Sequence, residues 1–181
     1  MKDEVTTGTI LISKPFMEDK RFEKTVILIT EHNDNGTIGL ILNKNTSIDI
    51  IDFIPSVSNQ SINIKQGGPV DTNNLFFIHK HPDLIHNCFK IKDGYFWGGD
   101  IKNVIEGMKR DEIKPQEILF FTGYSGWEKN QLKEEIEEGS WIIQNINLEI
   151  LEEPIDWSKL LIKINKEFEV WATAPSDFRL N

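Results

Sequence analysis

The strongest constraint on the fold lies between residues 25 and 43, where two apolar runs flank a turn signal. The runs read TVILIT and TIGLILN, and Asn33-Asp34-Asn35-Gly36 stands between them. Asn, Asp and Gly adopt the backbone conformations of tight hairpin turns more readily than other residues do. The first run is apolar on both faces, which is typical of a central strand that is covered on both sides. We therefore predict an antiparallel hairpin whose first strand is central.

Other short apolar runs predict further strands, since strands of this length need no more than a few apolar residues. These runs lie at residues 9–12, 62–64, 75–78, 118–121, 141–143 and 169–172. Apolar residues at helical spacing predict one helix after Asp100 and another after Asp156, each with the aspartate as its N-cap. A shorter helix is predicted over residues 47–54, capped by Ser47 and ended by Pro55.

A strand, a tight turn, a helix and another strand are predicted in succession from residue 118 to residue 143. Gly123 and Gly126 favour the turn, and residues 128–138 have helix-forming composition with Gly139 as a C-terminal stop. Residues 79–94 lack periodicity and are expected to be irregular. Adjacent strands that pair as hairpins, with helices inserted between them, predict a single α+β domain over residues 1–181 with a mixed, mainly antiparallel sheet.

Charge and composition restrict the classes of function. The formal net charge is −9 and most of the acidic excess is in the second half, so binding to phosphate backbones is disfavoured. A small basic cluster could form from Lys14, Lys20, Arg21 and Lys24. No apolar run approaches the ~20 residues that span a bilayer, and Cys88, the single cysteine, cannot form an internal disulfide. We therefore predict a cytoplasmic protein that does not bind membranes.

Several residues resemble parts of catalytic or metal sites. Ser125 follows a strand and precedes a helix, as a nucleophile elbow does, but the required G-x-S-x-G spacing is missing, so we predict a serine that caps the turn or faces solvent. His79, His81, His86 and Cys88 include pairs two residues apart, yet their order matches no zinc motif. The pairs Gly67-Gly68 and Gly98-Gly99 match no phosphate-binding loop. We predict no metal and no cofactor.

His32 ends a buried strand beside the predicted turn. Its imidazole could hydrogen-bond across the hairpin, near Asn43, and a lone histidine closes a polar network more often than it performs catalysis. The alternative is that His32 acts as a general base, which requires Asn43 and Tyr124 to converge with it on a pocket.

Four ordered blocks, which together cover nearly the whole chain, resemble the YqgE/AlgH family of bacterial proteins. They are Gly8 to Ile12 with Pro15, Asp19 and Phe22; Glu31-His32 with Gly36 to Asn43; Gly67 to Val70; and Gly123 to Trp127 with Gln131, Leu132, Glu135, Ile136, Gly139 and Trp141. The resemblance implies an α+β fold with a bent, partly barrel-like sheet ringed by helices, and no established enzyme activity. Some relatives are described as candidate transcriptional regulators, and no DNA-binding motif is recognisable in this chain.

The leading hypothesis is a non-enzymatic binding or regulatory protein with an unknown protein or small-molecule partner. Its working surface is expected on turns, where function is usually displayed on a rigid scaffold. The candidate surface consists of His32, Asn43, Gly67, Gly68, Pro69, Gly123, Tyr124, Trp127 and Gln131. The alternative is a small-substrate hydrolase with a pocket around His32, Asn43 and Tyr124.

Overall fold

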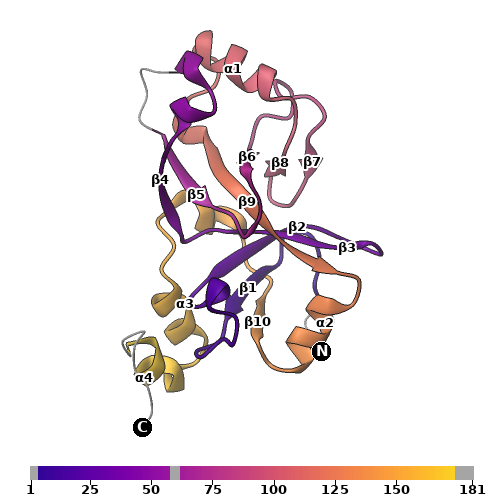
Figure 1. The fold of residues 1–181 in the computed structure, drawn as a ribbon, viewed down its shortest axis with the longest axis vertical. Coiled ribbons are helices and arrows are strands. Elements are labelled where there is room, and N and C mark those ends of the chain that lie inside the picture. The colour runs from indigo at the N-terminus through magenta and orange to yellow at the C-terminus, as the bar shows by residue number, and fades with distance from the viewer. Residues whose placement is uncertain (1–3, 58–61, 174–181) are drawn as a thin grey trace.

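The computed structural model describes residues 4–57 and 62–173 and consists of a ten-stranded sheet with helices around it (Figure 1). The strands are β1 Ile10–Ser13, β2 Val26–Asn33, β3 Gly36–Ile41, β4 Asn45–Asp49, β5 Asn63–Gln66, β6 Val70–His79, β7 Phe89–Lys90, β8 Phe96–Trp97, β9 Ile118–Glu128 and β10 Trp141–Gln144. The α-helices are α1 Ile101–Lys109, α2 Gln131–Glu137, α3 Trp157–Ile164 and α4 Glu169–Ala172. Short 3-10 turns are η1 Lys20–Phe22, η2 Ile50–Asp52, η3 Pro55–Val57, η4 Pro115–Glu117, η5 Leu148–Glu152 and η6 Lys166–Phe168.

The sheet has the order β10-β1-β2-β3-β9-β6-β8-β7, and β4 joins it through β5, which pairs with β9. The β5–β9 pair is parallel and the other pairs are antiparallel. Since β10 and β7 stand at opposite ends of the order, the sheet is not closed into a barrel. The predicted α+β class and the mainly antiparallel sheet are therefore confirmed.

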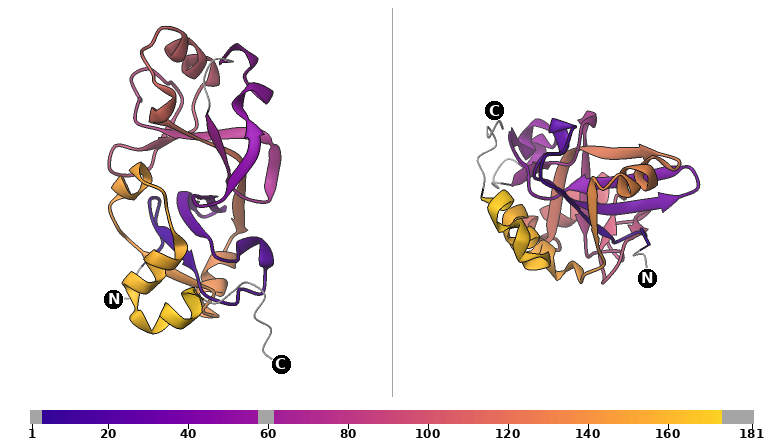
Figure 2. Two further views of the ribbon diagram at one scale, coloured as in Figure 1. Left: turned by 90° about the vertical axis from the view of Figure 1, so that its left-hand side faces the viewer. Right: turned by 90° about the horizontal axis from the view of Figure 1, so that it is seen from below.

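The predicted hairpin is β2 and β3, and its first strand is covered on both faces. Leu28 faces the largest core cluster, which α3 covers, whereas Ile27 faces a second cluster beneath α2. A third cluster packs α1 against β5, β6 and the first half of β9. α1 and the α3–α4 pair lie at opposite ends of the molecule (Figure 2). Burial on both faces explains why β2 is apolar at successive positions rather than at alternate ones.

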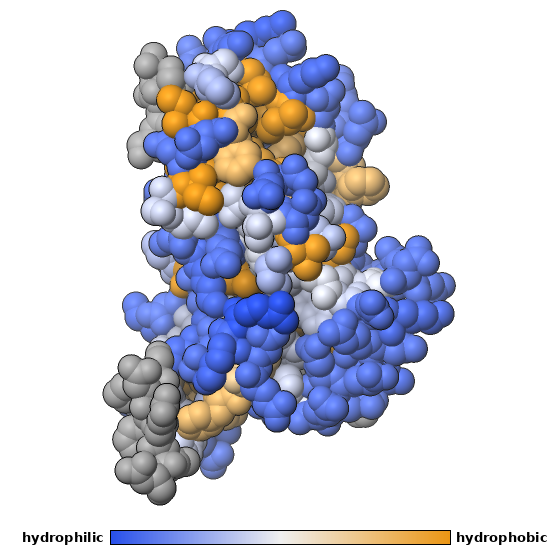
Figure 3. Space-filling model, viewed as in Figure 1, coloured by the Kyte–Doolittle hydropathy of each residue, from blue (hydrophilic) through white to orange (hydrophobic). Residues whose placement is uncertain are grey.

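Both amphipathic helices begin at their predicted caps. The Asp100 carboxylate accepts a hydrogen bond from the amide of Lys102, and the Asp156 carboxylate accepts one from the amide of Lys159. In the view of Figure 3, most of the surface is hydrophilic and hydrophobic side chains gather in the upper half, over η2, η3 and α1. Within the described ranges, no helix combines the length and apolarity needed to cross a bilayer.

The predicted turn from Gly123 to Gly126 is wrong, because β9 continues through these residues as one strand of eleven. Tyr124 pairs with Val70 on one edge and Gly126 pairs with Ile38 on the other, so neighbouring strands hold this segment extended. The change of direction comes later, at Asn130, whose φ of 68° is left-handed, and α2 begins at the next residue.

Two further predictions of secondary structure are wrong. Ser47 lies in β4, which pairs with β5, and Asp49 rather than Ser47 caps the turn that follows. Residues 169–172 form α4 instead of a strand, because Ala172 is buried against α3 and its carbonyl accepts a hydrogen bond from Ser158 Oγ at 3.0 Å. Packing on a neighbouring helix outweighs the strand preference of Val and Trp in this segment.

Candidate functional site

β9 changes its neighbours at Gly123. Its first half lies between β5 and β6, and its second half pairs with β3. The pair Val70 with Tyr124 is the last contact with β6, so beyond Tyr124 no described strand covers the edge opposite β3. The Glu128 amide donates to Gln131 Oε1 at 2.9 Å on that edge. Backbone groups two residues apart in a strand point to the same edge, so those of Gly126 face it as well.

Three glycines allow this exchange of strands. A Cβ at Gly67 would lie 2.3 Å from the Gly123 carbonyl oxygen, and one at Gly68 would lie 2.2 Å from that of Tyr124. Real Cβ atoms do not come so close, so the connection between β5 and β6 can cross β9 because it carries no side chains there. Gly123 itself has a φ of +65°, a conformation that L side chains rarely adopt.

The same crossing accounts for Ser125, which is fully buried. Its hydroxyl donates to the Gly67 carbonyl at 3.2 Å, and that carbonyl also accepts from the amide of Ile41 at 2.9 Å. The prediction that Ser125 caps a turn or faces solvent is therefore wrong. Its buried hydroxyl stabilises the crossing and is not available as a nucleophile.

A groove of about 740 Å³ lies beside the free edge of β9. Its walls are the loop of residues 14–22, Pro69 and Val70, and residues 126–140. These segments are far apart in the sequence, and each contains residues that carry the family resemblance. The groove therefore brings three of the four matching blocks to one surface.

The α2 side of the groove is fixed by the carboxylate of Glu135. Glu135 Oε2 accepts hydrogen bonds from the indole N–H groups of Trp127 at 2.9 Å and Trp141 at 2.7 Å. Glu135 Oε1 accepts one from Gln131 Nε2 at 3.0 Å. Phe22 stacks on Trp127 with ring centroids 6.2 Å apart and meets Trp141 edge-on at 5.8 Å. These contacts join Phe22, Trp127 and Trp141 into an aromatic cluster beside the groove.

The loop of residues 14–22 also carries an ion pair. The Arg21 guanidinium contacts Asp19 through Nη2 at 2.6 Å and through Nε at 3.0 Å, and these hydrogen bonds hold the pKa of Asp19 below its ordinary value. Across the whole lining, four carboxylates face two cations. The groove therefore has an acidic excess and suits a segment with positive charge.

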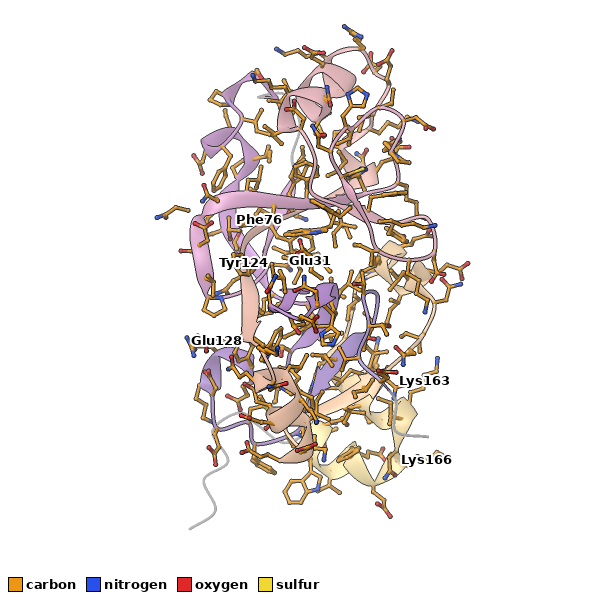
Figure 4. The ribbon with its side chains drawn as sticks, turned by 90° about the vertical axis from the view of Figure 1, so that its right-hand side faces the viewer. Glu31, Phe76, Tyr124, Glu128, Lys163 and Lys166 are labelled. Atoms are coloured by element: carbon orange, nitrogen blue, oxygen red, sulfur yellow. The ribbon has the colours of Figure 1, made fainter. Side chains whose placement is uncertain are left out.

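A second hollow of about 560 Å³ adjoins the groove and shares Val70, Gly126 and Trp127 with it. Glu31, Tyr124 and Glu128 line this hollow, and Figure 4 shows Glu31, Phe76 and Tyr124 close together. The Tyr124 ring meets Phe76 edge-on at 5.5 Å. No Lys, Arg or His among the described residues lines the hollow.

The structure does not bring His32, Asn43 and Tyr124 together. His32 Nδ1 bonds Thr37 Oγ1 at 2.7 Å near the hairpin turn, whereas Asn43 Oδ1 accepts from the Val26 amide at 2.9 Å at the other end. Six strand residues separate these ends, which corresponds to about 20 Å. The predicted bond across the hairpin thus exists, with Thr37 rather than Asn43.

His32 and Tyr124 also lie on opposite faces of the sheet. His32 pairs with Thr37, which pairs with Trp127, so these three side chains share one face. Tyr124 is three residues before Trp127 on the same strand and lies on the other face, because side chains alternate along a strand. A hydrolase pocket formed by His32, Asn43 and Tyr124 is therefore not assembled.

Two of the histidines that resembled metal ligands, His79 and His81, have structural contacts. His79 is buried, its Nε2 donates to the Gly98 carbonyl at 3.1 Å and its Nδ1 accepts from the His81 amide at 3.1 Å, and burial lowers its pKa. His81 Nε2 lies 3.4 Å from Glu117. Within residues 4–57 and 62–173, no three metal-ligating side chains gather at one place.

The predicted surface did not include Glu135, the central acceptor of the groove, or the loop of residues 14–22, although Glu135, Asp19 and Phe22 are among the residues that carry the family resemblance. The i,i+4 spacing of Gln131 and Glu135 indicates their contact along one face of a helix. No local pattern predicts that Trp127 and Trp141 donate to the same carboxylate, because the helix between them positions it.

Comparisons with known proteins agree with this description. A family model described as "AlgH-like" matches residues 10–169. A UPF0301 protein of Cytophaga hutchinsonii is 36% identical over 98% of this chain and 100% of its own length. A UPF0301 protein of Parabacteroides distasonis is 34% identical, covering 96% of this chain and 90% of its own.

Two solved structures share the fold. The crystal structure of a Corynebacterium diphtheriae protein has a TM-score of 0.75 at 23% identity and covers 96% of this chain and 95% of its own. The solution structure of the AlgH protein from Pseudomonas aeruginosa has a TM-score of 0.70 at 23% identity, covering 97% and 99%.

Proposed function

The chain belongs to the AlgH-like family, and we propose that it is a non-enzymatic binding protein whose groove beside β9 receives an extended segment of a protein partner. The observation that supports this most is the convergence of separate sequence blocks on the groove. Residues that carry the family resemblance line it, among them Pro15, Asp19, Phe22, Pro69, Val70 and Trp127. A regulatory role would be exerted through the bound partner.

The free edge of β9 favours a peptide segment over a compact small molecule. Exposed strand edges bind extended peptides through backbone hydrogen bonds, and side-chain hollows beside the edge supply specificity. The Gly126 backbone offers such an edge, and Phe22, which stacks on the buried Trp127, offers a half-buried ring for an apolar side chain. We do not propose hydrolase activity, since His32, Asn43 and Tyr124 lie apart.

A matched pair of substitutions tests the proposal. Val70 and Ile51 are 40% and 41% exposed, but Val70 lines the groove whereas Ile51 lies on η2, outside it. Peptides would be selected from a random displayed library on the wild type and measured by calorimetry against Val70→Lys and Ile51→Lys. We expect Val70→Lys to weaken the selected peptides by about tenfold or more, which is typical when a central interface position is blocked.

Ile51→Lys should leave the affinity within about twofold, as expected of a substitution outside the interface. Failure to recover any peptide, or equal loss in both variants, would contradict a binding groove at β9.

A cytoplasmic location stays a prediction from the sequence.

A further inference from the structure

We infer that the hollow beside Tyr124 binds a guanidinium group, presented by an arginine of the same extended segment. This inference rests on the proposed function of the groove, because the two hollows share Val70, Gly126 and Trp127. A segment that follows the free edge of β9 passes from the groove into this hollow. The residue that enters must suit the charge and shape of the hollow.

All described charged side chains that line the hollow are negative. Glu31 and Glu128 line it, Asn33 and Asn35 add neutral amides, and no described cationic side chain lines it. Trp97 Nε1 donates to Glu31 Oε1 at 3.0 Å and so orients that carboxylate. No described residue donates to Glu31 Oε2, which is left for a ligand. Two carboxylates in a hollow that no described cation lines favour a cationic ligand.

An aromatic ring face completes the site. Tyr124 is held edge-on against Phe76, and Phe76 stacks on Trp97 with ring centroids 6.1 Å apart. A Cβ at position 126 would lie 3.3 Å from Tyr124 Cε2, so the edge of the ring lies beside Gly126, and the half-buried Tyr124 lines the hollow. A half-buried tyrosine ring beside carboxylates attracts organic cations by cation–π interaction.

These features favour a guanidinium over an ammonium or a metal ion. A guanidinium is planar, stacks on aromatic rings and can donate to a carboxylate with two N–H groups at once. A metal ion would need more oxygen ligands than the two carboxylates provide, and it gains little from a ring face.

The first test uses ethylguanidinium as a probe and ethylurea as its neutral counterpart. Each would be titrated into the wild type while backbone amide signals are followed by NMR. We expect ethylguanidinium, and not ethylurea, to shift the signals of Tyr124 and Gly126. The shifts should be lost in Glu31→Gln/Glu128→Gln and retained in Glu112→Gln, since Glu112 is exposed and lines neither the hollow nor the groove. Equal shifts with ethylurea, or shifts that persist in the double variant, would overturn the inference.

The second test separates this inference from the proposed function. Arginine in a selected peptide would be replaced by citrulline, which has the same shape without the charge. We expect at least a fivefold loss of affinity for the wild type and no loss for the double variant. Peptides that bind the groove equally well with citrulline would refute the arginine site and leave the groove intact. If ethylguanidinium binds but no peptide does, the groove does not receive an extended segment, and the proposed function is refuted.

Discussion

At the scale of residues, the acceptor capacity of Glu135 organises the candidate site. One carboxylate satisfies two buried indole N–H groups and the amide of Gln131. Trp127 and Trp141 are 4% and 3% exposed, so neither indole has water as a ready alternative. When the donors stay buried, removing their acceptor lowers the free energy of unfolding by more than the net contribution of the hydrogen bonds, because the donors keep their desolvation penalty.

We expect Glu135→Ala to lower the free energy of unfolding by about 2–4 kcal/mol, because two buried donors are left without partners. Urea denaturation measures this loss. Glu137→Ala is the matched control on the exposed side of α2, and it should change stability by less than about 0.5 kcal/mol. Equal effects of the two substitutions would mean that the carboxylate of Glu135 contributes nothing specific.

At the scale of elements, β9 is organised by its crossing with the connection between β5 and β6. Gly67 and Gly68 lie against the backbone of β9, and Gly123 bends that strand where its neighbours change. Gly126 differs from these glycines, because the nearest atom to a Cβ there belongs to a side chain, 3.3 Å away. These four resemblance-bearing glycines thus divide into three that specify the crossing and one that lies beside the hollow.

Gly68→Ala should destabilise the protein by about 1–3 kcal/mol, since the added methyl group overlaps the backbone at Tyr124 and forces it to shift. Gly126→Ala is the comparison, and it should cost less than about 1 kcal/mol because the Tyr124 ring can move slightly. Thermal and urea unfolding of both variants provide the measurement. A Gly68→Ala variant as stable as Gly126→Ala would show that the crossing is looser than its geometry indicates.

The elements that sequence reasoning predicted correctly are those with local signals. The Asn33 to Gly36 turn sets the β2–β3 hairpin, and Asp100 and Asp156 set the starts of two helices. The errors fall where distant partners decide. Gly123 and Gly126 suggested a turn, but pairing with Val70 and Ile38 keeps them in a strand, and packing on α3 makes residues 169–172 helical.

Only part of the candidate site could be predicted, because distant partners also decide which residues line it. Trp127, Gln131 and Pro69 were singled out and do line the groove, whereas Asn43 bonds the backbone of Lys24 and Val26 at the start of β2. The loop of residues 14–22 carries matching residues, but its place beside α2 depends on contacts between segments more than a hundred residues apart. Local patterns contain no information about such contacts.

At the scale of the whole molecule, the net charge is acidic, and the one basic cluster that the sequence predicted does not form a free basic face. Arg21 pairs with Asp19, Lys20 lies 3.6 Å from Glu23, and Lys24 lies over the Trp157 ring at 5.8 Å. These cations therefore have contacts within the protein. A phosphate backbone would have to compete with those contacts while it is repelled by the net charge of −9.

We therefore expect no change in DNA mobility even at about 10 mM salt, where the screening length is about 30 Å and non-specific binding is strongest. The sensitivity of the assay is tested with a triple variant, Glu134→Lys, Glu137→Lys and Glu138→Lys. These positions on or beside α2 are exposed, so the substitutions turn one acidic surface basic. That variant should retard DNA at about 10 mM salt and release it at about 150 mM, as counterion release requires. Retardation by the wild type at low salt would show that charge does not exclude DNA, and a regulatory role through direct DNA contact would then have to be considered ahead of a peptide groove.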